Sequence, residues 1–183
     1  MHHIYHTEGI ILGNRNFSED GKYYYIFTRE LGMLCARASG VRKMSSKLRY
    51  ILQDFSYLNF DLVRGRDFWR LTSASKIGEL ENLPKSFEKF RIISNIARLL
   101  RRRLAGEEAN QKFFDDLVSG LRGLESAKSG SEINNTEVVI VLQALAHLGY
   151  VGSDKVSDLI SQVELRKIEI LSLINQTLRE THL

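Results

Sequence analysis

Residues 33–63, MLCARASGVRKMSSKLRYILQDFSYLNFDLV, carry the strongest structural signal in this 183-residue chain. An apolar run at 33–39 precedes a basic segment, and an alternating run follows at 55–63. There Leu58, Phe60 and Leu62 fall on one side of the chain, which is the period of a half-buried strand. Between the two runs, Ser45 or Ser46 can cap a short helix. The segment therefore predicts a strand, a short helix and a second strand.

Three more strands are expected near residues 5–14, 22–30 and 67–76, with glycine-containing turns at 30–32 and 64–66. Five short strands with one small helix between the third and the fourth is the element order of an OB-fold, a small Greek-key barrel. We therefore predict an all-β OB-fold barrel over residues 1–80.

The apolar period changes after Pro84, the only proline. Apolar residues then recur in steps of three and four, as on one face of a helix. Four such segments are visible. Gly149 ends the third, and the fourth, near 154–180, is expected to break in its middle. We predict an all-α helical bundle over residues 81–183, which makes the chain an α+β protein of two domains.

Positive charge is concentrated in the first half of the chain. Residues 1–80 hold 12 Lys/Arg and 8 Asp/Glu, whereas residues 81–183 hold 14 of each. Residues 37–49 contain five cations and no carboxylate, a pattern whose natural partner is a phosphate backbone. A second basic loop lies at 64–70, where an OB-fold flanks its ligand groove. The expected DNA-binding residues are Arg37, Arg42, Lys43, Lys47, Arg49, Arg64, Arg66 and Arg70.

Aromatic residues in the predicted strands are candidates for base stacking, because OB-folds hold single strands on exposed rings. Tyr24 has a tyrosine on each side, so at least one ring of the three points away from the core. Each ring taken alone is more simply a core residue, but we expect one of the set to stack on a base. The candidates are Tyr23, Tyr25, Tyr57 and Trp69.

The first predicted helix carries a line of arginines, Arg91, Arg98 and Arg102, opposite its apolar face. Three interpretations are open: a solvated helix face, an extension of the DNA path, or the cationic half of a pocket for an acidic protein tail. The spacing alone does not choose among them.

Several classes of site are not indicated. The single cysteine, Cys35, rules out an internal disulfide and a cysteine-built zinc site. His2, His3 and His6 have no carboxylate partner, so no metal site is expected. The sequence contains no recognisable phosphate-binding glycine loop or catalytic triad, so we expect neither an enzyme nor a cofactor. No leader peptide or membrane span is visible, which favours a soluble intracellular protein without membrane contact.

Several strings resemble the RecO family, the bacterial recombination mediators of DNA repair. They lie at residues 8–12 (EGIIL), 18–22 (SEDGK), 27–32 (FTRELG), 38–43 (ASGVRK), 52–55 (LQDF) and 63–66 (VRGR). The resemblance is specific over about residues 7–76, and Leu145, Leu148, Gly149 and Tyr150 resemble the end of a central helix in the second domain of that family. Many members place a four-cysteine zinc module after that point. Here residues 151–154 lead directly into the last helix, so the chain resembles a compact member without zinc.

The resemblance implies a cytoplasmic, nucleoid-associated mediator and not an enzyme. Such proteins bind single- and double-stranded DNA through the barrel and anneal complementary strands. They also engage the acidic, hydrophobic tail of single-stranded DNA-binding protein (SSB) and act with RecR to load RecA. Two alternatives remain: a protein-interaction adaptor that recognises acidic protein tails, and an OB-fold RNA-binding factor.

Overall fold

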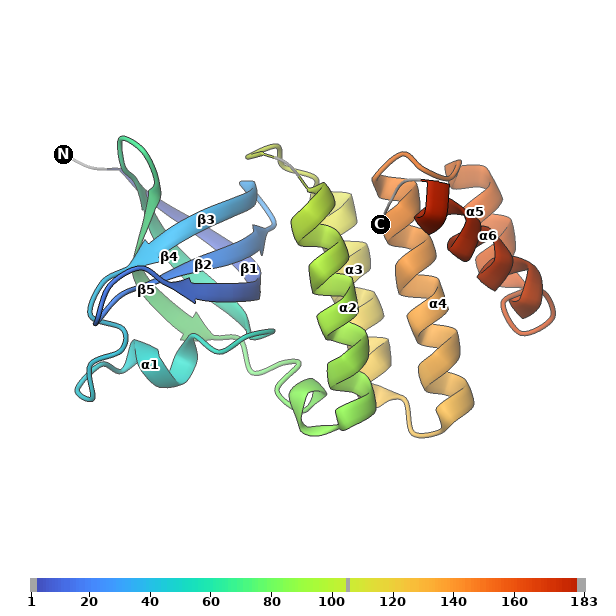
Figure 1. Cartoon of the computed structure of the whole chain (residues 1–183), viewed down its shortest axis with the longest axis horizontal. Coiled ribbons are helices and arrows are strands. Elements are labelled where there is room, and N and C mark those ends of the chain that lie inside the picture. Colours follow the sequence, from blue (N-terminus) through green and yellow to red (C-terminus); the bar gives the residue numbers. More distant parts are fainter. Residues whose placement is uncertain (1–2, 105, 181–183) are drawn as a thin grey trace.

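A computed structural model describes residues 3–104 and 106–180 of the chain. The first half is a five-stranded barrel and the second half consists of helices (Figure 1). The strands are β1 (Ile4–Asn16), β2 (Lys22–Thr28), β3 (Gly32–Ala38), β4 (Tyr57–Arg64) and β5 (Trp69–Lys76).

The barrel is closed in the order β1-β2-β3-β5-β4. Closure depends on β1, which pairs antiparallel with β2 through residues 9–16 and with β4 through residues 4–10. The remaining gap is closed by a short parallel contact between β3 and β5, at Ala36↔Trp69 and Arg37↔Arg70. Five strands with a helix between the third and the fourth confirm the predicted OB-fold barrel.

Helix α1 (Leu48–Ile51) joins β3 to β4, but the predicted serine cap is wrong. The N-cap residue is Lys47, and no side chain caps this helix. The backbone explains the difference, because the N–H of Arg49 donates to the Ser46 carbonyl and that of Tyr50 to the Lys47 carbonyl, both at 3.3 Å. These tight turns satisfy the first N–H groups of the helix, so no serine hydroxyl is needed.

Inward-pointing side chains at alternate strand positions fill the interior of the barrel. Tyr24 and Ile26 of β2 point inward with Leu58, Phe60 and Leu62 of β4, and all five are at most 2% exposed. Inward and outward residues alternate along each strand because successive Cβ atoms point to opposite faces. The inward set predicted for β4 is therefore confirmed.

The second half contains five helices and a short 3-10 turn in the described residues. These are η1 (Leu83–Lys85), α2 (Phe87–Arg103), α3 (Gln111–Ser126), α4 (Gly130–His147), α5 (Ser153–Ser161) and α6 (Lys167–Glu180). Gly149 ends α4 as predicted, with a φ of +79° and with the N–H of Tyr150 donating back to the Leu145 carbonyl. The expected break of the last helix is the gap between α5 and α6.

The barrel and the helices share a core. Ile10, Leu12 and Phe27 point out of the barrel and join one buried cluster with residues of α2 and α3. The Phe27 ring lies 5.3 Å from Phe113 and 5.5 Å from Phe114 of α3, measured between centroids. Figure 1 shows α2 and α3 beside the barrel and α4 to α6 on their far side. The boundary at residues 80/81 between two separately folding domains stays a prediction.

Candidate nucleic-acid interface

The outer face of β2 and β3 carries alternating aromatic and basic side chains. The register pairs Tyr23 with Arg37 and Tyr25 with Cys35, so these four residues share one side of the sheet. All four are half-buried. Arg15 of β1 pairs with Tyr23, and its guanidinium carbon lies 5.1 Å from the Tyr23 ring centre. In OB-folds this face and its flanking loops hold oligonucleotides.

Two loops bring further rings to this face. Phe17, in the β1–β2 loop, lies 4.8 Å from Tyr23, and Phe68, in the β4–β5 loop, lies 6.2 Å from the same ring. The Arg37 guanidinium lies 4.2 Å from Phe17 and 5.7 Å from Phe68, and its buried Nε has no hydrogen-bond acceptor among the described residues. The side chains of Arg37 and Tyr23 are therefore set between two aromatic loops.

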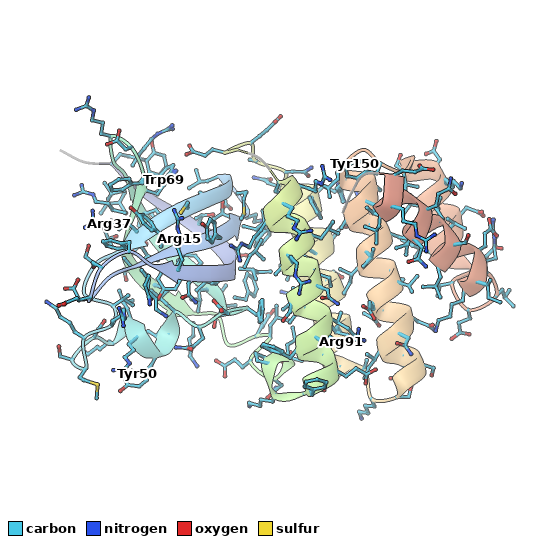
Figure 2. All side chains as sticks on the ribbon, viewed as in Figure 1. Arg15, Arg37, Tyr50, Trp69, Arg91 and Tyr150 are labelled. Atoms are coloured by element: carbon cyan, nitrogen blue, oxygen red, sulfur yellow. The ribbon has the colours of Figure 1, made fainter. Side chains whose placement is uncertain are left out.

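Helix α2 contributes a second arginine. The Arg101 guanidinium lies 4.3 Å above the Tyr25 ring. Gly13 makes room for it: its φ is +149°, and a Cβ there would lie 2.7 Å from Arg101 Nη1. We call the whole set, Arg15, Phe17, Tyr23, Tyr25, Arg37, Phe68 and Arg101, the aromatic–arginine face. Figure 2 labels Arg15 and Arg37 on the barrel.

The eight arginines and lysines predicted to bind DNA are spread over the barrel: Arg37 belongs to this face, whereas Arg42 and Arg49 line a separate cavity beside α1. Arg37 and Arg70 are neighbours across the β3–β5 contact, which links the basic segment at 37–49 to the loop at 64–70. Two of the eight form ion pairs, Lys43 with Asp20 at 3.4 Å and Arg64 with Glu107 at 3.3 Å. The other six have no carboxylate partner within residues 3–104 and 106–180: Arg37, Arg42, Lys47, Arg49, Arg66 and Arg70.

Both ion pairs are exposed, and exposed pairs contribute only about 0–1 kcal/mol. A hydrogen bond from Ser18, together with Lys43, lowers the pKa of Asp20, so this carboxylate stays charged beside the basic segment. Two of the eight predicted cations are thus partly neutralised. The remaining six keep their charge available to an anionic ligand.

Two of the four rings predicted to stack on bases are buried, which corrects that expectation. Tyr57 is 6% exposed, lies 6.1 Å from Phe114, and donates its hydroxyl to Glu8 Oε2 at 2.5 Å. Burial, then the Glu8 hydrogen bond, raises the pKa of Tyr57. Trp69 is 3% exposed, and its Nε1–H donates to Glu107 Oε1 at 2.8 Å. Neither ring has a face open to a base.

Sequence reasoning missed four members of the aromatic–arginine face: Arg15, Phe17, Phe68 and Arg101. Phe17 and Phe68 lie in loops, where no periodicity marks a side chain. The position of both loops beside the OB-fold groove was the available signal. Arg101 belongs to the run of three arginines at 101–103, but its contact with Tyr25 depends on how α2 packs against the barrel.

The helical half contains a separate groove between α2, α4 and α6, with a volume of about 650 Å³. Leu99, Val141 and Leu171 line it with apolar surface, and Arg98 and Arg102 supply positive charge. Two of the three predicted helix arginines therefore line this groove. Arg91 lies nearer the start of α2, outside the lining (Figure 2), and is 3.9 Å from Glu137, itself a lining residue.

The structure also bears on metal ligands and on apolar helices. No group of three His, Cys, Asp or Glu side chains in the described part of the chain is arranged to hold a metal ion. His2 lies outside the described residues. His6 pairs with Asp61 at 2.6 Å, which corrects the expectation that it has no carboxylate partner. None of the described helices combines the length and apolar character needed to cross a bilayer.

Comparison with known proteins connects this architecture to one family. Residues 1–79 match the model of the N-terminal region of recombination protein O. The DNA repair protein RecO of Caldanaerobacter subterraneus is 28% identical over 144 residues, which is 79% of this chain and 58% of the relative. RecO of Pelotomaculum thermopropionicum is 29% identical over 147 residues, 80% of this chain and 56% of the relative. The chain thus spans just over half the length of these relatives.

Proposed function

We propose that the chain is a member of the RecO family and acts as a DNA-repair and recombination mediator whose barrel binds DNA. The observation that carries the proposal is the aromatic–arginine face, with the unpaired cations of two loops around it. In the proposed complex, bases of a single strand stack on the half-buried rings of this face while arginines and lysines contact phosphates.

Single-strand binding requires two kinds of contact that occur together on this face. Base stacking on an aromatic ring contributes about 1–3 kcal/mol per base and tolerates any sequence. Tyr23 and Tyr25 are the half-exposed strand rings, and Phe17 and Phe68 flank them. Each phosphate neutralised by a cation releases counterions, so binding weakens as salt rises. Double-stranded DNA would use the phosphate contacts alone.

Strand annealing follows from the same electrostatics. Two complementary strands repel each other, and a cationic surface that binds both reduces that repulsion. This role makes and breaks no covalent bond and uses no nucleotide, so the proposed activity is that of a mediator and not of an enzyme. Cooperation with RecR and loading of RecA are part of the proposal through the resemblance to the RecO family alone.

The α2–α4–α6 groove is the proposed site for the tail of single-stranded DNA-binding protein. That tail is acidic and hydrophobic, and the groove combines an apolar lining with Arg98, Arg102 and Lys167. A peptide carboxylate would pair with the arginines while apolar side chains fill the groove. The groove also supports the alternative function, a protein-interaction adaptor for acidic tails.

The DNA proposal is tested by fluorescence anisotropy with a labelled oligothymidylate over a salt series. Tyr23→Ala and Phe17→Ala are expected to weaken binding by about 1–3 kcal/mol each, because each removes a stacking ring. Phe87→Ala is the matched control, since this ring is 85% exposed and lies at the start of α2, away from the face. Equal affinities for all three variants and the unmodified protein would contradict base stacking on this face.

Charge reversal tests the phosphate contacts separately. Replacing Arg42, Lys43 and Lys47 by Glu is expected to lower affinity and to reduce the log–log salt slope by roughly 0.7 per lost single-strand contact. An unchanged slope would remove the basic segment from the interface. If the unmodified protein binds a tail peptide but not DNA at physiological salt, the adaptor function is correct. RNA of the same sequence distinguishes the RNA-binding alternative.

A further inference from the structure

A second basic site lies at the end of the barrel beside α1. It is a cavity of about 350 Å³ lined by Lys22, Tyr24, Val41, Arg42, Arg49, Leu52 and Gln53. Three of the lining residues are cations and none is a carboxylate. Tyr24 points into the barrel, on the opposite side of β2 from Tyr23 and Tyr25. The cavity is therefore distinct from the aromatic–arginine face.

Three separate segments bring the cations together. Lys22 begins β2 on the same side of the strand as Tyr24. Arg42 lies in the loop before α1, where its N–H donates to the Asp20 carbonyl and its Nη1 donates to the Ser18 carbonyl, both at 3.1 Å. Arg49 belongs to α1. Backbone contacts thus hold this loop in place without neutralising its charge.

Two acids in neighbouring segments, Asp20 and Asp54, are engaged with other groups. Asp20 pairs with Lys43, and Asp54 accepts a hydrogen bond from Asn14 Nδ2 at 2.7 Å. Lys22, Arg42 and Arg49 form no ion pair within the described residues. Three like charges around one small cavity repel one another, and an anion placed between them relieves that repulsion.

Uncharged donors complete the cavity. Burial, then the charge of Asp54, raises the pKa of Tyr24 to about 12, so its hydroxyl keeps a proton that it can donate. Gln53 Nε2 donates to the Arg49 carbonyl at 2.6 Å, which ties α1 to the segment that follows it. The lining therefore presents charged and neutral donors together, as oxyanion sites do.

We propose that this cavity binds one phosphate group, held by Lys22, Arg42 and Arg49. Arginine offers paired N–H donors that match phosphate oxygens, and lysine adds a compact positive charge. In a DNA complex, either a terminal phosphate or an internal phosphodiester would occupy the cavity. That the phosphate belongs to DNA rests on the proposed function, whereas the anion site itself does not.

Inorganic phosphate tests the site without DNA. Thermal unfolding is followed while phosphate is titrated at constant ionic strength, with chloride as the balancing salt. A saturable rise in melting temperature is expected, because a ligand that binds the folded state alone stabilises it. Lys22→Gln and Arg49→Gln should each weaken phosphate binding roughly tenfold, since each removes a charged hydrogen bond.

Lys128→Gln is the matched control, because Lys128 is exposed and lies between α3 and α4. It should leave the phosphate response unchanged. An identical response in all three variants, or an equal effect of chloride alone, would overturn the proposal. Arg49 lies on the exposed surface of α1, so Arg49→Gln remains informative even if Lys22→Gln impairs folding.

Oligonucleotides with and without a 5′-phosphate identify the source of the group. Tighter binding of the phosphorylated strand, lost in Lys22→Gln, supports a terminal phosphate. Equal binding of both strands, weakened alike in Lys22→Gln, supports an internal phosphodiester. If DNA binding is absent but the response to inorganic phosphate persists, the proposed function fails while the anion site stands. DNA binding that Lys22→Gln leaves unchanged would overturn the assignment to DNA.

Discussion

Phe114 offers a direct test of whether the barrel and the helices unfold together. Its ring is 1% exposed and packs on Phe27 and Tyr57 of the barrel. Truncating a buried phenylalanine to alanine costs about 3–5 kcal/mol, from lost burial and the cavity left behind. For a chain of this length, Phe114→Ala should lower Tm by roughly 10 °C.

Two probes report the two halves separately during urea unfolding. Trp69 is the only tryptophan and is buried at the start of β5, so its fluorescence follows the barrel. Circular dichroism at 222 nm mainly follows the helices. Both midpoints should fall together in Phe114→Ala, whereas Phe87→Ala, which truncates an 85%-exposed ring, should change stability by less than about 0.5 kcal/mol. A helical midpoint that falls while the fluorescence midpoint stays fixed would refute the shared core and favour two independent domains.

Three further predictions concern the barrel. Gly13→Ala should cost about 1 kcal/mol by urea unfolding, because it places a side chain at φ +149° against Arg101; an unchanged midpoint would contradict this. Burial raises the pKa of Tyr24 to about 12 and also raises that of Tyr57, so the folded state binds these protons more tightly than the unfolded state. The contribution of these two tyrosines to the free energy of unfolding should therefore be fully present below pH 10 and should fall as pH rises above it. Urea midpoints that stay level from pH 9 to 11 would count against this. Burial also raises the pKa of Cys35, so iodoacetamide should alkylate it slowly at pH 7 and more slowly when DNA covers the face, whereas a rate indifferent to DNA would argue against that coverage.

The barrel was predictable because its strands obey a local rule. Leu58, Phe60 and Leu62 alternate with outward residues, and a single turn of helix separates this run from the strand before it. Such patterns are visible in a short window of sequence. The element order then leaves few topologies, and the OB-fold is one of them.

The local alternation did not predict which helices pack on the outward-facing residues of a strand. The alternation places Tyr57 opposite Leu58, and polar neighbours suggested solvent there, whereas α3 packs Phe114 on that ring. This contact joins residues 57 positions apart, and no local pattern encodes it. For the helix arginines, the helical spacing correctly placed Arg98 and Arg102 on one side of α2. Their position beside a groove depends on how α4 and α6 pack against α2, which the spacing does not encode.

The double pairing of β1 has a consequence for how the chain is made. Ile4 pairs with Val63, so the first strand has no partner on one edge until β4 has been synthesised. During translation that edge stays open while about sixty residues leave the ribosome, and open edges of this kind promote aggregation. Early pairing with β2, only a short turn away, protects the opposite edge. We therefore expect stalled nascent chains that end before β4 to be sensitive to protease, and chains that extend beyond β5 to resist it.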